Sequence, residues 1–315
     1  MVDNIIEIKD LVKRYDKADS NAVDGVSFNV KRGEFFALLG PNGAGKTTTL
    51  SVLTTILSKT SGQVEVDGFD IEKNSSEIRK RIGVIFQNPS LDINLTAEEN
   101  VRFHAILYGL FPFRPTFASM PDVYKKRVME LSGVLEIEKA IFDPVKSFSG
   151  GMKRKLEIIR SLMHNPKILY LDEPTSGLDP ASRRRLWEYL GKVRETEKTT
   201  MFLTTHYLEE AEDADRVAII SRGKIISFGT PGKIKRDLVH EYLIVDANKR
   251  ADLKKQLKDM KVDFVENQRI KIDISENNTQ EILKKIEVPL SYIDIQKPTL
   301  EEAYLKITKG KEKKR

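Results

Sequence analysis

The chain has no cysteine, no long apolar run and only a small excess of charge. Without cysteine it forms no disulfide and no thiolate metal site, which is compatible with the cytosol. No stretch approaches the roughly 18 apolar residues of a membrane helix, and the opening MVDNIIE lacks the basic and apolar regions of a signal peptide. If the protein works at a membrane, we therefore expect a partner to supply the membrane span.

The composition is that of a globular protein. The 315 residues suggest two domains, or one large domain with an appendage, and 40% hydrophobic residues suffice for a sizeable core. Much of the formal net charge of +6 lies in residues 306–315. We expect a solvated basic tail there, with attraction to anionic phosphate or lipid headgroups as the alternative.

Residues 40–47 read GPNGAGKT, the pattern of a phosphate-binding loop. Its glycines allow backbone N–H groups to turn toward phosphate oxygens, Lys46 is placed to reach the β- and γ-phosphates, and the Thr47 hydroxyl to bind Mg²⁺. Residues 34–39 predict a strand before the loop and residues 46–57 a helix after it, which is the context that the motif requires. The residues expected to bind ATP in this segment are Gly40, Pro41, Asn42, Gly43, Ala44, Gly45, Lys46, Thr47 and Thr48.

Residues 168–173, ILYLDE, predict an apolar strand that ends in two carboxylates. In a phosphate-loop enzyme we expect Asp172 to hold Mg²⁺, directly or through water. Glu173 is then a candidate general base that polarises the attacking water. Two acids could also close a strand in solvent, but a preceding phosphate loop favours the catalytic interpretation.

The hydrophobic pattern predicts an α/β fold with a helical insertion. The expected strands cover residues 5–8, 22–30, 34–39, 64–70, 82–87, 167–172, 199–206 and 216–221. Residues 88 to 164 are predicted to be a helical subdomain, in which Thr96 and Glu99 form a capping box and the proline- and phenylalanine-rich residues 112–121 form a loop. Further helices are expected at residues 123–135, 152–164 and 181–195.

The C-terminal region has a different order of predicted strands and helices. Residues 229–232, GTPG, are predicted to be a linker. Residues 241–297 follow the order strand, helix, strand, strand, helix, strand, which is typical of ferredoxin-like domains. The expected domains are therefore residues 1–235, 236–305 and the tail 306–315.

With these motifs in this order, the chain resembles the ATP-binding subunit of an ABC transporter over residues 5 to about 235. The loop Ser149-Gly150-Gly151-Met152 resembles the family's signature, which binds the γ-phosphate of ATP held by a second subunit. Ser149 is also a suitable N-cap for the helix that follows. The family's commonest signature begins with Leu and ends with Gln, where this chain has Phe148 and Met152; similar variants are familiar in the drug-efflux branch.

The resemblance assigns four further residues. Gln87 matches the Q-loop, which touches Mg²⁺ and senses the membrane partner, and Asp179 matches the D-loop at the dimer interface. His206 matches the switch histidine that contacts the γ-phosphate, and Tyr15 the aromatic residue that stacks on adenine. Alternatives remain: Tyr15 as a strand-edge aromatic, His206 as a hydrogen-bonded strand-end residue, and Gln87 as a partner of a neighbouring loop. The proline-rich segment 111–121 is unlike the loop of compact members.

The C-terminal region resembles the extra domain of daunorubicin-resistance-like exporter ATPases. The resemblance implies a homodimer around two ATP and two Mg²⁺, and a separate ABC-2-type membrane permease that exports a hydrophobic drug or lipid, with no nucleic-acid partner. It also implies a cytoplasmic protein held at the inner face of the membrane by that permease. One alternative is a soluble ABC ATPase acting on nucleic acid or the ribosome, but such proteins carry long coiled coils or two ATPase units. Another alternative is a module that binds nucleotide without hydrolysing it. The presence of Glu173 and His206 argues against this alternative.

Overall fold

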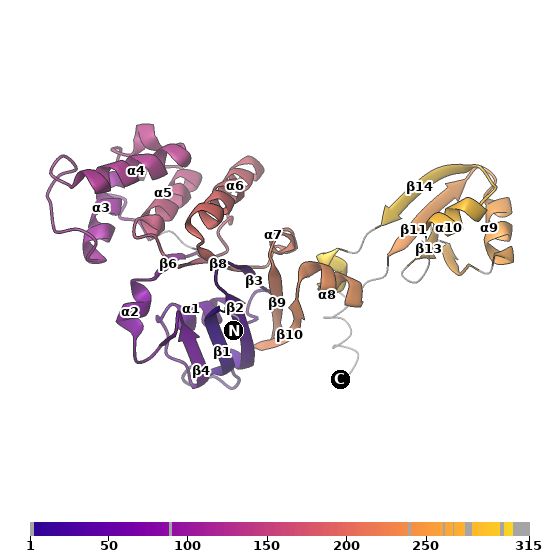
Figure 1. The fold of residues 1–315 in the computed structure, drawn as a ribbon, viewed down its shortest axis with the longest axis horizontal. Helices are drawn as coiled ribbons and strands as arrows, with labels where there is room; N and C mark the ends of the chain where they lie inside the picture. The colour runs from indigo at the N-terminus through magenta and orange to yellow at the C-terminus, as the bar shows by residue number, and fades with distance from the viewer. Residues whose placement is uncertain are drawn as a thin grey trace. The chain divides into compact units, whose positions relative to one another are not determined.

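The computed structural model describes residues 3–87, 90–238, 241–260, 262–266, 268–274, 279–296 and 299–304. The chain divides into two compact units, Met1–Phe228 and Gly229–Arg315 (Figure 1). The predicted basic tail, residues 306–315, lies outside the described residues. Within the described ranges, no helix combines the length and the apolar character needed to cross a membrane.

A six-stranded sheet in the order β10-β9-β3-β8-β7-β6 forms the centre of the first unit. Its strands are β3 (Phe35–Leu39), β6 (Ile82–Ile85), β7 (Ile168–Asp172), β8 (Thr200–Thr205), β9 (Arg216–Ser221) and β10 (Lys224–Gly229). The strands β9, β3, β8, β7 and β6 are parallel. Every residue of β3, β7 and β8 is buried, as expected for parallel strands that are covered on both faces.

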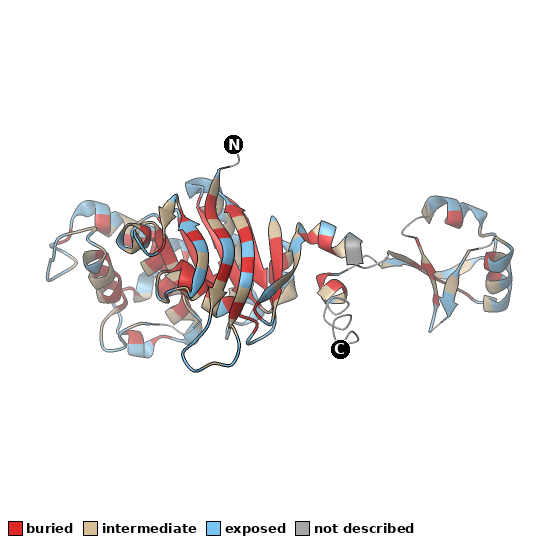
Figure 2. Ribbon diagram, turned by 90° about the horizontal axis from the view of Figure 1, so that it is seen from below, coloured by how far each residue is buried: buried red, intermediate tan, exposed pale blue. Residues whose placement is uncertain are grey.

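A second, antiparallel sheet in the order β2-β1-β4-β5 packs against the first across a shared apolar core. Its strands are β1 (Asn4–Lys13), β2 (Val23–Lys31), β4 (Ser61–Val66) and β5 (Phe69–Asp70). The rings of Phe28, Phe36 and Phe202 pack against one another, with the Phe36 centroid 5.0 Å from Phe28 and 5.3 Å from Phe202, and the latter two 6.1 Å apart. β1 is longer than the predicted strand 5–8, because pairing with β2 resumes at Leu11 after a register shift that hides its alternation. Figure 2 shows buried residues recurring along these strands.

Helices of very different lengths connect the strands of the first unit. They are α1 (Lys46–Leu53), α2 (Ser75–Arg79), α6 (Pro180–Glu197) and α7 (Leu208–Glu212). The predicted helix 46–57 is too long, because Thr55 adopts a left-handed φ of 61° and the Thr54 hydroxyl donates to the Leu50 carbonyl at 2.9 Å. The apolar spacing continues past this stop, although the helix does not.

The predicted helical insertion is present, with α3 (Ala97–Leu107), α4 (Asp122–Val134), α5 (Gly150–Leu162) and two 3₁₀ turns, Glu138–Ala140 and Val145–Ser147. The capping box is confirmed: the Glu99 amide donates to the Thr96 hydroxyl at 3.2 Å, and the Glu99 carboxylate accepts from the Thr96 amide at 2.8 Å. Ser149 caps α5 by accepting from the Met152 amide at 3.2 Å.

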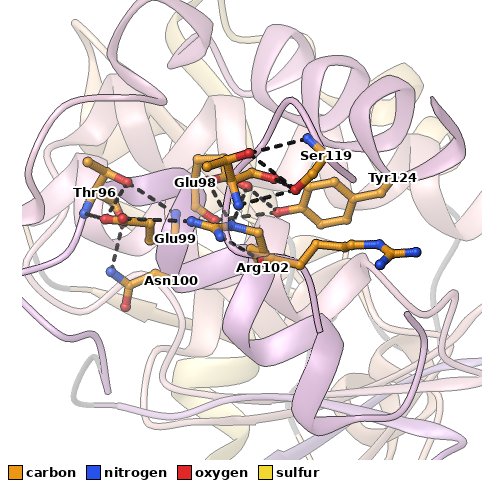
Figure 3. Close-up of polar contacts among 9 residues, drawn as sticks. Thr96, Glu98, Glu99, Asn100, Arg102, Ser119 and Tyr124 are labelled. Atoms are coloured by element: carbon orange, nitrogen blue, oxygen red, sulfur yellow. Dashed lines mark hydrogen bonds and ion pairs between the residues drawn. The ribbon is translucent and has the colours of Figure 1, made fainter. Parts of the chain in front are cut away.

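A buried polar cluster ties the proline-rich loop to these helices (Figure 3). The Tyr124 hydroxyl donates to the Glu98 carboxylate at 2.9 Å, and Arg102 Nε donates to the same carboxylate at 3.1 Å. Arg102 also donates to the Arg114 carbonyl at 2.9 Å. The edge-on ring of Phe117 lies 6.2 Å from the Tyr124 ring. The segment predicted as a loop is therefore a loop with specific anchors.

The second unit begins with a helix where a linker was predicted. α8 (Pro231–Leu238) starts inside residues 229–232, and the Lys233 amide donates to the Thr230 hydroxyl at 3.2 Å. Threonine before a helix and proline in its first position are start signals as well as turn signals, which is why a helix begins at Pro231 within the predicted linker.

The remaining elements follow in the predicted order. They are β11 (Tyr242–Ala247), α9 (Arg250–Asp259), β12 (Phe264–Glu266), β13 (Ile270–Asp273), α10 (Thr279–Lys285) and β14 (Leu290–Gln296). The strands form an antiparallel sheet in the order β12-β13-β11-β14. Leu253 and Leu257 of α9 and Ile282 of α10 join the inward residues of β11 and β13 in a separate apolar core.

The helical part contains a buried histidine that favours its neutral form. His104 Nε2 is buried and has no hydrogen-bond partner among the described residues, and the ring lies 4.2 Å from that of Tyr108. Burial, together with the charges of Arg160 and His164, lowers the pKa of His104 from 6.5 to about 3. The pKa of His104 is lower in the folded state than in the unfolded state. Its contribution to folded-state stability is therefore fully present above pH 6.5 and is lost as the pH falls toward 3.

We expect the free energy of unfolding to decrease as the pH is lowered from 6.5 toward 3. His104→Phe should reduce the slope of that decrease by up to about 1.4 kcal/mol per pH unit, the amount that corresponds to uptake of one proton. Urea titrations from pH 7 to 4, followed by fluorescence of Trp187, the single tryptophan, measure both slopes. Parallel curves for the two proteins would contradict the assignment.

Candidate nucleotide-binding and hydrolysis site

The carboxyl ends of four adjacent parallel strands meet at one edge of the central sheet. β3, β8, β7 and β6 are neighbours in that order, and register pairs such as Leu39 with Thr205 keep their ends level. The residues that follow these ends are Gly40, His206, Glu173 and, after one intervening residue, Gln87. The parallel strand order therefore brings these four residues to the same edge of the sheet. Ligands of open α/β sheets bind at this edge.

The phosphate loop has no room for side chains at two of its glycines. A Cβ at Gly40 would lie 2.3 Å from the Ile220 carbonyl oxygen, and one at Gly45 would lie 2.5 Å from the Ala22 carbonyl oxygen. Gly43 and Gly45 also have φ values of 75° and 107°, which favour glycine. The loop is thus held tightly round the start of α1, as a phosphate-binding loop requires.

Lys46 is buried at the first position of α1. Its Nζ donates to the carbonyls of Gly40 at 2.8 Å and Pro41 at 3.2 Å, and it lies 3.7 Å from Glu173 Oε1. Burial lowers the pKa of Lys46, and the nearby carboxylates of Glu173 and Asp172 oppose that shift. A cation in such a weakly screened position interacts strongly with an anion beside it.

Asp172 and Thr47 form the oxygen pair expected for Mg²⁺. The Thr47 hydroxyl donates to Asp172 Oδ1 at 3.4 Å, and the Thr204 hydroxyl donates to the same oxygen. Asp172 is 3% exposed; burial and the charge of Glu173 raise its pKa, against hydrogen bonds from both threonines. A divalent cation would offset the free-energy cost of burying the ionised Asp172 carboxylate. Hydroxyl and carboxylate oxygens are ligands that Mg²⁺ accepts.

No group of three or more histidine, cysteine or acidic side chains in the described part of the chain is arranged to hold a metal. The Thr47–Asp172 pair therefore fits an ion that keeps water and phosphate oxygens among its ligands, as Mg²⁺ usually does.

Three predicted side chains converge on the Glu173 carboxylate. Gln87 Nε2 donates to Oε2 at 3.1 Å, His206 Nδ1 lies 2.9 Å from Oε1, and Lys46 Nζ lies 3.7 Å from Oε1. Glu173 also has a left-handed φ of 46°, which costs about 1–2 kcal/mol for a residue with a Cβ. Strain of this kind gathers at functional sites.

Tyr15 lies beside the first turn of α1. Its hydroxyl shares a hydrogen bond of 3.2 Å with the Thr48 hydroxyl, and the residue is 44% exposed. An exposed aromatic ring next to the phosphate loop has a face on which a base could stack.

Ser149, Gly150, Gly151 and Asp179 make no hydrogen bond or ion pair with the Glu173 cluster in the described ranges. Ser149 and Asp179 cap α5 and α6, the latter by accepting from the Ser182 amide at 3.0 Å. Of these four residues, all but the partly exposed Gly151 are exposed.

Two buried residues of the site, Glu210 and Arg154, were missed from the sequence. Glu210 accepts from the Thr205 hydroxyl at 2.6 Å and from the Thr175 hydroxyl, and so fixes the segments on either side of the Glu173–His206 pair. Arg154 of α5 contacts the main chain after β7. Neither Glu210 nor Arg154 stands out in the sequence.

The comparisons with known proteins agree with this geometry. The family model described as "ABC transporter" matches residues 23–176. LnrL of Bacillus subtilis strain 168, a linearmycin resistance ATP-binding protein, is 33% identical over 317 residues, covering 96% of this chain and 98% of LnrL. DrrA of Streptomyces peucetius, a daunorubicin/doxorubicin resistance ATP-binding protein, is 38% identical over 256 residues, covering 80% of this chain and 74% of DrrA.

YbhF of Escherichia coli strain K12, a probable multidrug ABC transporter ATP-binding protein, is 40% identical over 233 residues. That match covers 74% of this chain but 38% of YbhF, so the chain spans well under half of that relative.

Solved structures share the fold of the first unit. An ATP-binding subunit of an ABC transporter superposes with a TM-score of 0.65 at 31% identity, covering 74% of this chain and 92% of that one. A dimeric ATP-binding cassette in a post-hydrolysis state, bound to ADP and Pi, superposes with a TM-score of 0.64 at 27% identity, covering 71% and 98%. Fold, site geometry and relatives together show that the chain belongs to the ATP-binding subunits of the ABC transporter family, which are ABC-type ATPases.

Proposed function

We propose that two copies of this chain hydrolyse Mg-ATP at shared sites, and that they power export of a hydrophobic drug or lipid through a separate ABC-2-type permease. The observation that carries the hydrolytic part is the convergence of Lys46, Gln87 and His206 on the Glu173 carboxylate. Phosphoryl transfer to water in phosphate-loop enzymes depends on positioning the water and neutralising charge, and this cluster has the groups for both.

Each residue has one task in this proposal. Backbone N–H groups of the phosphate loop bind the phosphates, and Lys46 exchanges the Gly40 and Pro41 carbonyls for β- and γ-phosphate oxygens. Thr47 and Asp172, with Gln87 beside them, would hold Mg²⁺, which would supply positive charge to neutralise the phosphates. Glu173 accepts a hydrogen bond from the attacking water and polarises it.

Two further residues complete the site. His206 orients the Glu173 carboxylate through their 2.9 Å contact and reaches the γ-phosphate. The exposed ring of Tyr15 stacks on adenine, which holds the nucleotide at the end away from the reaction.

The signature loop and Asp179 serve the nucleotide of the second copy. The exposure of Ser149, Gly150 and Asp179 supports this, because residues of a composite site must be free to meet another subunit. Ser149 and the two glycines after it place the N-terminal end of α5, with its free N–H groups, toward an anion. A two-fold symmetric dimer then contains two complete sites.

The transported substrate and the permease are inferred from relatives. LnrL, DrrA and YbhF are named for linearmycin resistance, daunorubicin/doxorubicin resistance and multidrug transport, which supports export of a drug. In this proposal the protein is cytoplasmic and is held at the inner face of the membrane by its permease.

Lys46→Ala should lower kcat for ATP hydrolysis by on the order of 10²–10³-fold, because it removes the buried cation from the transferring phosphoryl group. Phosphate release by the purified protein measures this. Lys59→Ala is the matched control, since Lys59 pairs with Glu72 at 2.7 Å instead, and it should keep wild-type turnover. Wild-type turnover by Lys46→Ala would contradict the phosphate-loop assignment.

Glu173→Gln should bind Mg-ATP but hydrolyse it at least about 100-fold more slowly, because the amide keeps the volume and loses the charge that polarises water. An ATP-dependent dimer in size-exclusion chromatography is the expected companion result. Glu98→Gln, which changes a buried carboxylate that contacts Arg102 and Tyr124, should hydrolyse normally. Unchanged hydrolysis by Glu173→Gln removes this residue from the role of base.

The specific activity of the wild type should rise with protein concentration, because no single subunit closes its own site if Ser149 serves the neighbour. The test is a dilution series assayed for ATP hydrolysis, with sedimentation run in parallel with Mg-ATP. Constant specific activity while dimers give way to monomers would refute the composite site.

A further inference from the structure

Arg154 is a buried cation in the helix that follows the signature loop. It lies in α5 and is 4% exposed. Its Nε donates to the Pro174 carbonyl at 2.7 Å, and its NH2 group donates to the carbonyls of Glu173 at 3.3 Å and Asp172 at 3.4 Å. Its NH1 group donates to the Phe86 carbonyl. One guanidinium thus binds the main chain at the exits of both β7 and β6.

These two exits carry the side chains that meet at the site. Gln87 directly follows Phe86, and Glu173 lies at the carboxyl end of β7. The two side chains are joined by the 3.1 Å hydrogen bond from Gln87 Nε2 to Glu173 Oε2. Arg154 therefore fixes the backbones of both partners of that hydrogen bond.

The main chain of Glu173 needs such support. Its left-handed φ of 46° is strained, its amide donates to the Thr204 carbonyl at 3.0 Å, and its carbonyl accepts from the Ser176 amide at 3.1 Å as well as from Arg154. The planar fork of arginine can bind several carbonyls at fixed angles, which the single ammonium of lysine cannot.

The same face of α5 also holds the other end of the Gln87 segment. Glu157, which is 1% exposed and pairs with Arg154 at 2.9 Å, accepts from the Ser90 amide at 2.9 Å. Arg160 donates to the Ser90 carbonyl at 2.6 Å and hydroxyl at 2.7 Å. Phe86 and Ser90, which flank Gln87, are therefore both tied to α5.

We propose that Arg154 is a positioning residue that makes the alignment of Glu173 and Gln87 depend on the position of the signature helix. α5 begins at Gly150, and Arg154 lies about one turn into it. A group that binds the signature loop and moves α5 also moves Arg154. The main-chain carbonyls bound to Arg154 then move with it, and these determine the position of the Glu173 carboxylate. The signature of each subunit thereby controls the hydrolytic residues of that same subunit. This inference rests on the hydrolytic role proposed for Glu173.

The first test is the double variant Arg154→Gln with Glu157→Gln, which avoids leaving one buried charge without its partner. We expect kcat for ATP hydrolysis to fall by about 10–100-fold, the loss typical of a misplaced catalytic group, while KM for ATP stays within about threefold. The Kd for trinitrophenyl-ATP should stay in the same range. Unchanged kcat would overturn the proposal.

Arg154→Lys is the second variant, which keeps a cation opposite Glu157 and loses the fork. It should have a kcat between those of the wild type and the double variant, whereas a merely structural cation would be replaced without loss. Wild-type kcat in Arg154→Lys would therefore overturn the role of the fork.

The matched control is Arg102→Gln with Glu98→Gln. This buried pair has the same chemistry in the same helical part, with Arg102 Nε 3.1 Å from Glu98 Oε1, and no hydrogen bond joins it to residues 172–174 in the described ranges. It should lower the melting temperature and leave kcat of the folded protein unchanged. An equal loss of kcat in the control would show that the Arg154 effect is only structural.

A double-mutant cycle with Glu173→Gln separates this proposal from the proposed function. If Arg154 acts through Glu173, the Arg154→Gln/Glu157→Gln pair should cause little further loss of single-turnover rate in the Glu173→Gln background. A full, additive loss there would overturn the positioning role. Wild-type hydrolysis by Glu173→Gln alone would instead overturn the proposed base, whatever the Arg154 variants do.

Discussion

The site depends on keeping the Glu173 carboxylate buried without leaving it unpaired. A buried carboxylate loses its hydration, and this loss is tolerable only when donors and cations replace water. Gln87, His206 and Lys46 do so from three different strand exits. The parallel order of β3, β8, β7 and β6 brings the carboxyl ends of these strands together. The pairing of the Glu173 carboxylate therefore depends on the topology of the sheet.

The residues of this constraint could largely be predicted from the sequence. The phosphate loop is a local motif, because its eight positions are consecutive in the sequence and glycine stands where the backbone takes positive φ values, at Gly43 and Gly45. Asp172 and Glu173 follow an unmistakable apolar strand. Contacts that form across the fold have no such signature. Arg154 sits in the run Lys153-Arg154-Lys155, which looks solvated, and only its central residue faces the sheet and is buried.

Boundaries were harder to predict than elements, for local reasons. The apolar spacing of residues 46–57 persists after the helix stops, because Thr55 turns the chain by a left-handed φ that no pattern marks. The dipeptide Thr230-Pro231 has the chemistry of both a turn and a helix start. In β1 a register shift between Ile8 and Leu11 hides the alternation that a longer strand would otherwise show.

The polar core of the helical part has an energetic consequence. Glu98, Arg102 and Tyr124 satisfy one another inside the fold (Figure 3), and a buried network of this kind has one low-energy arrangement instead of many. The network joins α3 to α4 through the Tyr124–Glu98 hydrogen bond and holds the loop through the Arg114 carbonyl. Loss of any one of its three side chains would therefore leave buried polar groups of the others without that partner.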